Sequence, residues 1–429
     1  MKRKLIEELI RWKSENNNTP ILMTGAKGVG KTYLAYDFAK AFFEHISYIN
    51  FERNPECASF FCTLDAEEAT SAIHSYFQIS EDSPQEGRIL ILDEIGRCEE
   101  ALQSLKKGVF ADSFRYIIAI SSHPLSKEQE MVFSKLSVHP LEFDEFLRAI
   151  GSEWYIEAIL NHFYSNTNIP EIVHKELLSL HRLYLQIGGM PGLVNEYLNF
   201  SDAVNVPEQH SFIVGSYHDY ISRDNTDSDA LKMKQVFDSL TYQLIKENKK
   251  FQYKIIRKGT THAMYRDAIQ KLVEQNYVIR CNKISIDQLQ TPSELILLNN
   301  SCDAANSNFK LYLPDTGLLY SKLIEEQGIS GVVNNKKALL ENYVAQSLQA
   351  KNYPFVFWES ESMAKIDFII AKNLEIIPIE IHESSNTRSK SISVLRQKCE
   401  FPYAIKISSK NFEYSNQIKY VPYYAVFCL

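Results

Sequence analysis

The chain has 429 residues, of which 45% are apolar and 23% charged, and its 46 Lys and Arg against 53 Asp and Glu give a formal net charge of −7. These values exclude a disordered or fibrous chain and fit roughly two to four globular domains. No apolar run approaches the roughly 18 residues that cross a bilayer, so we expect no membrane association. Seven cysteines without a C-x-x-C pair indicate a reduced, cytoplasmic setting.

A short strand followed by a glycine-rich loop is predicted near the start of the chain. Residues Pro20–Thr24 are apolar, and a helical pattern extends over Tyr33–Phe43. The connecting sequence has the spacing G-x-x-x-x-G-K-[ST], in which glycines let backbone N–H groups curl around phosphates at the start of a helix. The residues expected to bind a nucleotide are Gly25, Ala26, Lys27, Gly28, Val29, Gly30, Lys31, Thr32 and Tyr33. We expect Lys31 to reach the β- and γ-phosphates and Thr32 to offer its hydroxyl to Mg²⁺.

A second buried strand, Arg88–Asp93, is predicted to end at two consecutive carboxylates. Parallel strands present their carboxyl ends to a ligand crevice. We therefore expect Asp93 to hold Mg²⁺ through water and Glu94 to polarise the water that attacks the γ-phosphate. Glu94 and Lys31 are the predicted catalytic residues.

Together these motifs resemble the AAA-type P-loop ATPases. The sequence from Asp93 to Lys106 is similar to one branch of a prokaryotic, AAA+/STAND-like family that joins such an ATPase to an uncharacterised carboxy-terminal domain. Further matches follow in order at 140–146 (PLEFDEF), 188–191 (GGMP), 309–319 (FKLYLPDTGLL), 340–342 (LEN), 366–368 (IDF) and 377–381 (IPIEI). The resemblance covers nearly the whole chain and implies ATP and Mg²⁺ as cofactors.

Residues 151–230 predict a helical lid, which carries 11 acidic and 3 basic side chains. In related signal-transducing ATPases a Gly-x-Pro in the lid approaches the nucleotide, so the resemblance makes Pro191 a candidate sensor of the nucleotide. Glycine and proline also simply end helices. Two other candidate sensors of the γ-phosphate, Ser121 and Ser122, follow a predicted strand, although a serine pair is also common in turns.

Residues 231–300 carry 12 basic and 6 acidic side chains and predict a winged-helix-like domain. The expected order is helix, short extended piece, helix and hairpin, at 231–247, 251–256, 260–275, 277–280 and 295–298. Basic residues precede the second helix at Lys249, Lys250, Lys254, Arg257 and Lys258, and the exposed positions of that helix would include His262, Arg266 and Lys271. Such a helix fits a DNA major groove with the lysines on phosphates. Winged helices in this ATPase class also serve only as packing modules.

Residues 335–429 predict helix, strand, strand, helix and strand, and their polar residues resemble a PD-(D/E)xK nuclease core. In that core, carboxylates on adjacent strands hold Mg²⁺ and a lysine stabilises developing charge. The corresponding positions are Glu341, Lys365, Asp367, Glu380 and His382. His382 takes the place of the lysine, and strand alternation puts Lys365 on the face of Asp367, where it would supply the missing cation. The alternative is a decayed site in an intact fold.

The sequence thus predicts an α/β protein with a P-loop AAA-type ATPase domain (1–150), a helical lid (151–230), a winged-helix-like domain (231–300) and a restriction-endonuclease-like α/β domain (301–429). Its expected function is ATP binding with slow, Mg²⁺-dependent hydrolysis to ADP that drives a conformational switch. DNA and an unidentified protein are the expected partners, and oligomers are compatible with this class.

Two other functions stay open at this point. A nucleotide-gated DNA nuclease would depend on Asp367 and Glu380. A regulatory scaffold would bind ATP without turnover. Glu94 favours turnover, since a purely structural nucleotide site has no need of a carboxylate there, and the basic segment at 249–258 favours nucleic acid.

Overall fold

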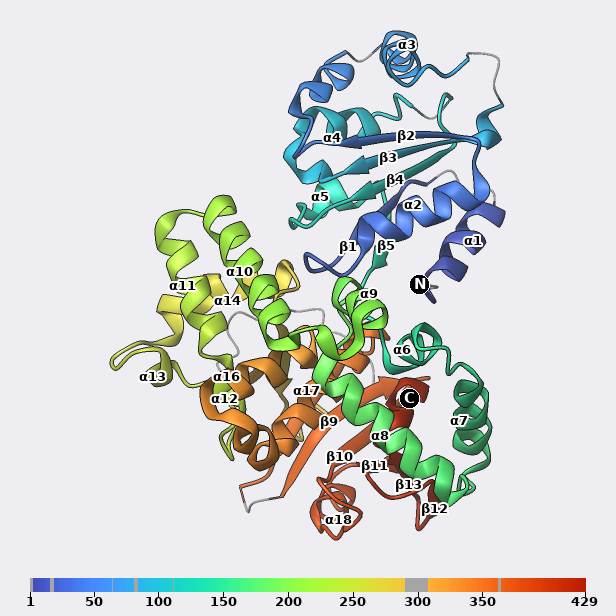
Figure 1. Ribbon diagram of the computed structural model, residues 1–429. Coiled ribbons are helices and arrows are strands. Elements are labelled where there is room, and N and C mark those ends of the chain that lie inside the picture. The colour runs from blue at the N-terminus through green and yellow to red at the C-terminus, as the bar shows by residue number, and fades with distance from the viewer. Residues whose placement is uncertain are drawn as a thin grey trace. The chain divides into compact units, whose positions relative to one another are not determined.

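The computed structural model describes residues 3–15, 19–63, 65–80, 84–110, 112–289, 308–361 and 364–429. The chain divides into two units, Lys2–His139 and Pro140–Leu429. Figure 1 shows a sheet with helices in each of them. Within the described ranges, no helix is both long enough and apolar enough to cross a bilayer.

The N-terminal unit is built on a parallel sheet of five strands in the order β2-β3-β4-β1-β5. The strands are β1 (Ile21–Thr24), β2 (His45–Asn50), β3 (Arg88–Asp93), β4 (Tyr116–Ile120) and β5 (Ser134–Ser137). The helices are α1 (Ile6–Ser14), α2 (Lys31–Phe42), α3 (Ala66–Phe77), α4 (Glu99–Lys106) and α5 (Lys127–Glu130).

The central strands of this sheet are covered on both faces. Every residue of β3 and β4 is buried, which explains their continuous apolar sequence. Figure 1 shows α2 on one side of the sheet and α3 and α4 on the other. All five strands run parallel, so the carboxyl ends of β1 and β3 lie at the same edge, with β4 between them. The loop and the two carboxylates predicted from the sequence therefore share one edge of the sheet.

The C-terminal unit begins with helices and continues into a second sheet. Its helices before that sheet are α6 (Phe143–Ala149), α7 (Trp154–Ser165), α8 (Glu171–Ile187), α9 (Pro191–Phe200), α10 (Val206–Asp224), α11 (Asp227–Asp238), α12 (Leu240–Leu244), α13 (Tyr253–Ile256) and α14 (His262–Glu274). Three further helices are α16 (Thr316–Asn334), α17 (Lys336–Ala350) and α18 (Ser391–Arg396).

The second sheet has eight strands in the order β12-β13-β11-β10-β9-β8-β6-β7. They are β6 (Ile279–Lys283), β7 (Phe309–Tyr312), β8 (Phe355–Glu359), β9 (Lys365–Lys372), β10 (Glu375–Ile381), β11 (Ala404–Ser408), β12 (Glu413–Ser415) and β13 (Ile418–Pro422). Strands β8, β9 and β10 are antiparallel neighbours, and β11 lies parallel to β10. The sequence pattern missed β8, so the observed order after α17 is three strands, a helix and then further strands.

The segment expected to form a winged helix differs from its prediction in several elements. The piece at 251–256 contains the short helix α13 instead of an extended strand, and the first long helix breaks at Ser239 into α11 and α12. The strand β6 pairs with β7 and with β8, so it belongs to the eight-stranded sheet. The other predicted strand of the hairpin, 295–298, lies outside the described residues.

Several of the sequence motifs meet in one place inside the C-terminal unit. The buried carboxylate of Asp315 accepts hydrogen bonds from the backbone N–H groups of Gly189 at 2.5 Å and Gly317 at 2.8 Å. The N–H of Leu141 donates to the carbonyl of Gly189 at 2.7 Å. A Cβ on Gly189 would lie 2.2 Å from the Leu141 oxygen, so only glycine fits there. The amide of Asn342 completes the network through the backbone of Leu313. The residues of these motifs therefore hold separate segments of the C-terminal unit together.

Candidate functional site

The glycine-rich loop connects β1 to α2, and its glycines are required by backbone geometry. Gly25 has φ of +142°, and a Cβ at this position would lie 2.1 Å from the carbonyl oxygen of Val138. Gly30 caps the start of α2 with φ of +89°, in the left-handed region. Left-handed turns before a helix leave its first N–H groups pointing into the loop, which is the arrangement that binds phosphate.

Lys31 is buried at the first turn of α2, and its ammonium lies under the loop. The ammonium donates to the carbonyl oxygens of Gly25 at 2.8 Å and Ala26 at 3.0 Å. Burial lowers the pKa of Lys31 to about 8, the charge of Glu94 opposes that shift, and the charge of Lys27 adds to it. The ammonium is therefore held inside the loop at an electrostatic cost that an anion would relieve.

The oxygen atoms expected to bind Mg²⁺ come together at the end of β3. The hydroxyl of Thr32 donates to Oδ2 of Asp93 at 2.9 Å. The hydroxyl of Tyr48 and the amide of Asn50 donate to the same oxygen at 2.7 Å and 3.2 Å. All three donors use Oδ2, so among the described residues Oδ1 is left to accept from a water. Hard oxygen ligands beside a phosphate loop fit Mg²⁺.

Tyr48 and Asn50 were not predicted from the sequence. Both are on β2, and the register of the sheet pairs Asn50 with Asp93. Burial, followed by hydrogen bonding and the charge of Asp93, raises the pKa of Tyr48 to about 12. The strand β2 has the mixed sequence HISYIN, in which neither residue stands out.

Glu94 follows Asp93 and is held by three residues from two segments, the glycine-rich loop and the turn after β4. The backbone N–H and the hydroxyl of Ser122 donate to its carboxylate at 3.2 Å and 2.8 Å. The ammonium of Lys27 lies 3.4 Å from Oε1, and Nδ1 of His123 lies 3.4 Å from Oε2. Glu94 also has φ of +54°, a left-handed conformation that costs a non-glycine residue roughly 1–2 kcal/mol and occurs at functional sites.

The groups around Glu94 keep its carboxylate ionised. Burial by itself would raise its pKa, but the interaction with His123, the charge of Lys27 and the hydrogen bond from Ser122 together hold the pKa of Glu94 well below its usual range. Lys27 also pairs with Glu52 at 3.2 Å. The carboxylate therefore remains a hydrogen-bond acceptor throughout the ordinary pH range.

Of the two predicted serine sensors, Ser122 contacts Glu94, whereas the hydroxyl of Ser121 donates to the backbone carbonyl of His123 at 2.8 Å. His123 was missed by the sequence analysis. Its Nε2 lies 3.3 Å from the guanidinium of Arg97. A guanidinium has no acceptor, so Nε2 accepts and the ring proton faces Glu94. The third sensor candidate, Pro191, begins α9 in the C-terminal unit, and its role stays a prediction.

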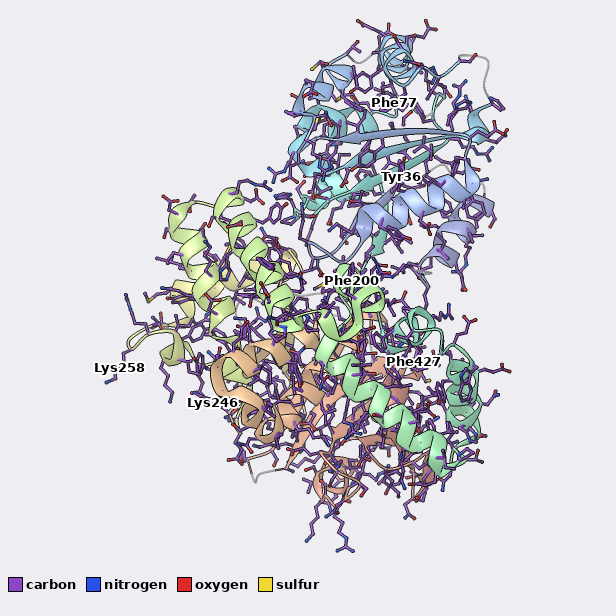
Figure 2. The ribbon with its side chains drawn as sticks, in the orientation of Figure 1. Tyr36, Phe77, Phe200, Lys246, Lys258 and Phe427 are labelled. Atoms are coloured by element: carbon purple, nitrogen blue, oxygen red, sulfur yellow. The ribbon has the colours of Figure 1, made fainter. Side chains whose placement is uncertain are left out.

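The remaining loop residues divide by exposure. Gly28, Thr32 and Tyr33 are exposed, whereas Ala26 and Val29 are buried and anchor the loop. Tyr33 lies on the first turn of α2 with 55% of its surface exposed. Figure 2 shows Tyr36, one turn further along the same helix.

The nuclease-like residues of the C-terminal unit lie near one another, but each buried carboxylate already has cationic partners. Glu341 on α17 is 2.8 Å from the ammonium of Lys249, 3.4 Å from that of Lys310 and 4.0 Å from that of Lys337. Lys337 also lies 3.3 Å from Oδ1 of Asp367. An ammonium group thus stands between the two carboxylates that the resemblance assigns to a metal.

Glu380 is held by a different set of partners. Ser389 donates to it at 2.6 Å, and Lys406 and His382 lie 3.4 Å away. Oδ2 of Asp367 accepts from the backbone N–H of Ile381 at 2.8 Å. In the part of the chain that the structure describes, no group of three or more His, Cys, Asp or Glu side chains is arranged to hold a metal ion. The expected Mg²⁺ ligands of a nuclease core do not fit a metal here, because lysines are placed between them.

Lys365 and Asp367 lie on one face of β9, as strand alternation predicts, and line the same cavity. Lys365 is exposed whereas Asp367 is buried, and a catalytic role for Lys365 stays a prediction. Lys249, expected on the DNA-facing surface, is buried against Glu341, and Lys250 pairs with Glu359 at 2.5 Å. The predicted basic surface is therefore reduced to three residues. Lys254, Arg257 and Lys258 are exposed, and Figure 2 shows Lys258 at the margin of the C-terminal unit.

The predicted recognition helix is α14, and its polar positions have different environments. Arg266 is exposed and lies 3.0 Å from Asp267, and Lys271 pairs with Asp229 at 2.7 Å. His262 is half-buried at the helix start. Of the seven cysteines, six are described and none forms a disulfide, and Cys302 lies outside the described residues.

Comparison with known families assigns the N-terminal unit. Residues 17–147 match the family model described as an AAA domain. Residues 179–327 and residues 336–426 match two further models, each described as a domain of unknown function. Among curated proteins no sequence matches the chain.

Among solved structures, the chain is similar to a Walker-type ATPase of Pyrococcus abyssi, with 14% identity over 75% of this chain and 95% of that one, at a TM-score of 0.41. It is also similar to C. elegans PCH-2, with 16% identity over 47% and 60% of the two chains at a TM-score of 0.30. A third is a STAND protein with a tetratricopeptide repeat sensor from Pyrococcus horikoshii, with 13% identity over 82% and 45% at a TM-score of 0.29.

Likenesses this weak carry no argument about activity. The AAA domain match at 17–147 agrees with the glycine loop, the buried lysine and the paired carboxylates, which together support a P-loop nucleotide site of the AAA type in this part of the chain.

Proposed function

We propose that the N-terminal unit binds ATP with Mg²⁺ and hydrolyses it slowly to ADP and phosphate. The observation that carries this proposal is Glu94, an ionised carboxylate at the end of β3 beside the phosphate loop, held by Ser122, His123 and Lys27. A site that only bound nucleotide would gain nothing from a buried, strained carboxylate at this position.

Each group has a distinct task in the proposed reaction. The loop N–H groups and the ammonium of Lys31 bind the phosphates. Thr32 and Asp93 would hold Mg²⁺, which when bound offsets the charge of the β- and γ-phosphates. Glu94 orients a water in line with the γ-phosphate and accepts its proton.

The contacts of Glu94 also support a slow rate. Both of its oxygens already accept hydrogen bonds from Ser122, and Lys27 and His123 lie against them. The carboxylate must give up one of these contacts before it can accept a proton from water. We infer that nucleotide binding, which draws Lys27 toward phosphate, releases Glu94 for this task.

The test is phosphate release by the full chain with ATP and Mg²⁺, compared with Glu94→Gln, Lys31→Met and Glu52→Gln. Glu94→Gln should keep ATP binding and lower turnover by about 100-fold or more, the usual contribution of a positioned base. Lys31→Met should weaken binding itself. Glu52→Gln removes the other carboxylate partner of Lys27 and serves as the matched control, with turnover retained.

Two results would contradict this proposal. ATP binding without any phosphate release from the wild type would favour the scaffold alternative. Equal turnover in the wild type and in Glu94→Gln would remove Glu94 from the mechanism.

We further propose that hydrolysis acts as a conformational switch whose response is carried by segments 151–230 and 231–300, in a cytoplasmic protein that acts with a protein partner or as an oligomer. DNA contact through Lys254, Arg257 and Lys258 is a second part of this proposal, supported by their exposure. Fluorescence anisotropy with duplex DNA should then lose its salt-dependent signal in Lys254→Ala with Lys258→Ala. Unchanged DNA affinity in that double variant would exclude this surface.

The proposal does not extend to DNA cleavage. Metal-dependent cleavage needs carboxylates that are available to Mg²⁺, and Glu341, Asp367 and Glu380 are each engaged by lysine, backbone or serine donors.

A further inference from the structure

The C-terminal unit contains a cavity of about 510 Å³ that none of the preceding functions uses. It lies between the end of α12, the start of α17 and the strands β8 and β9. Its charged lining residues are Lys246, Glu247, Lys249, Lys310, Lys337, Glu341, Glu359, Lys365, Asp367 and Glu383. The volume falls within the roughly 300–1,000 Å³ of pockets that hold small ligands.

The inner end of this cavity, which we call its floor, carries a surplus of positive charge. Two buried lysines, Lys249 and Lys310, and the partly exposed Lys337 face two carboxylates, Glu341 and Asp367. Burial by itself would lower the pKa of Lys310, but the charges of Glu341 and Asp367 raise it above its ordinary value. For Lys337 the same two carboxylates also outweigh burial and raise the pKa to about 12. Three ammonium groups thus lie against two carboxylates, and one positive charge is left over.

The charges at the entrance of the cavity do not cancel this surplus. The exposed pair Glu247 and Glu383 is balanced by Lys246 and Lys365. Glu359 is already paired with Lys250 at 2.5 Å. The unbalanced charge therefore belongs to the floor lysines, of which Lys249 and Lys310 are buried, where Coulomb interactions are little screened, and Lys337 is partly exposed.

The ammonium groups of the floor also have unused hydrogen-bond donors. An ammonium carries three N–H donors. Among the described residues, Lys249 donates only to Oε1 of Glu341 at 2.8 Å, and Lys310 only to Oε2 of Glu341 at 3.4 Å. Both side chains are 8% exposed. Buried donors without acceptors are costly, so the floor favours a ligand rich in acceptor oxygens.

We propose that this cavity binds a small phosphate-bearing anion directly on its lysines, without a divalent metal. A phosphate group supplies negative charge and several acceptor oxygens, which are the two things that the floor lacks. Lys337 occupies the space between Glu341 and Asp367 and so excludes a metal there. The site that resembles a nuclease core is thereby converted into an anion receptor.

The test is calorimetric titration with inorganic phosphate and with pyrophosphate, in EDTA, on the full chain carrying Lys31→Met so that the phosphate loop does not contribute. Binding should be detected, and Lys310→Met should weaken it by about tenfold or more, the usual effect of losing a charged hydrogen bond. Lys175→Met, at a lysine of α8 that is 73% exposed and lies outside the cavity lining, is the matched control and should leave the affinity unchanged. Lys365→Met, at the exposed entrance, should weaken binding without disturbing the buried floor, and it keeps the test informative if Lys310→Met fails to fold.

Glu341→Gln separates this proposal from a metal site. Removing the carboxylate that competes for the lysines should tighten phosphate binding several-fold, whereas a metal site would lose its ligand and its affinity. Three results would overturn the proposal: no phosphate binding in EDTA, binding that Lys310→Met and Lys365→Met leave unchanged, or Mn²⁺ binding that is lost in Glu341→Gln. Binding of a DNA oligonucleotide but of neither small phosphate would also overturn it, in favour of a nucleic-acid surface.

Discussion

Nucleotide binding should be coupled to the uptake of a proton by Lys31. In the ligand-free protein, burial lowers the pKa of this lysine to about 8 from its ordinary 10.5, with Lys27 adding to the shift and Glu94 and Asp93 opposing it. Phosphate oxygens around the ammonium would return the pKa to its ordinary range or above. Restoring the ordinary pKa corresponds to about 3 kcal/mol of interaction between the charged ammonium and the phosphates.

The sign and size of the pH effect follow from these values. A folded protein without ligand keeps about nine tenths of Lys31 charged at pH 7 and about one tenth at pH 9, given a pKa of about 8. Only the charged form binds phosphate well, so affinity for ADP should fall about tenfold as the pH rises from 7 to 9. At pH 8.5 binding should take up about three quarters of a proton.

Isothermal titration calorimetry in buffers of different ionisation enthalpy measures this uptake directly. ADP avoids turnover during the titration, and its terminal phosphate titrates near pH 6, outside the range used. Lys40→Met, on the exposed side of α2, should keep the coupling, whereas Lys31→Met should abolish it. An ADP affinity that does not change between pH 7 and 9, with no proton uptake, would refute the claim that Lys31 binds phosphate as an ammonium whose pKa burial has lowered.

Three further outcomes concern stability and are measured by urea or thermal unfolding. Gly189→Ala should destabilise the C-terminal unit severely, because its Cβ would lie 2.2 Å from the oxygen of Leu141. Gly192→Ala in α9, where a Cβ would meet nothing within 4 Å, should be neutral or stabilising. Equal effects of the two substitutions would contradict this packing. Burial lowers the pKa of His181 to about 3 and that of His210 to about 4 from 6.5, so stability should be full above pH 6.5 and fall as the pH drops. His181→Phe should reduce this dependence, and an unchanged dependence would contradict the assignment to His181. Leu92→Ala, fully buried in β3, should cost about 2–5 kcal/mol in the N-terminal unit, and a loss below 1 kcal/mol would show that the sheet relaxes around it.

The parts of the nucleotide site that were predicted depend on local sequence and on the rule that parallel strands end at the same edge of a sheet. The glycine spacing fixed the loop, and the apolar strand fixed Asp93 and Glu94 at the same edge. Tyr48, Asn50 and His123 were missed because their contacts depend on strand register and on a turn, which no periodicity encodes. Their types are also too common for a spacing to single them out.

For the polar residues of the C-terminal unit, the sequence predicted the positions on the strands but not the interaction partners. Sequence spacing correctly placed Asp367 and Glu380 on neighbouring strands. Glu341 pairs with Lys249 and Lys310, which come from segments far from it in the chain, and Glu380 pairs with Lys406 on the neighbouring strand β11. A sequence pattern does not show these ion pairs. The residue types suggested a catalytic metal site, whereas in the structure these carboxylates form ion pairs with lysines.

The pairing of β6 with β8 means that the two regions of unknown function cannot be separated without breaking a sheet. The two regions described as domains of unknown function end and begin at 327 and 336, yet Asn282 of one is paired with Val356 of the other in a continuous sheet. A gene fragment cut between them would leave β8 with an open edge, which invites aggregation. We therefore expect the two regions to be inherited together, and expression of either alone to give insoluble protein.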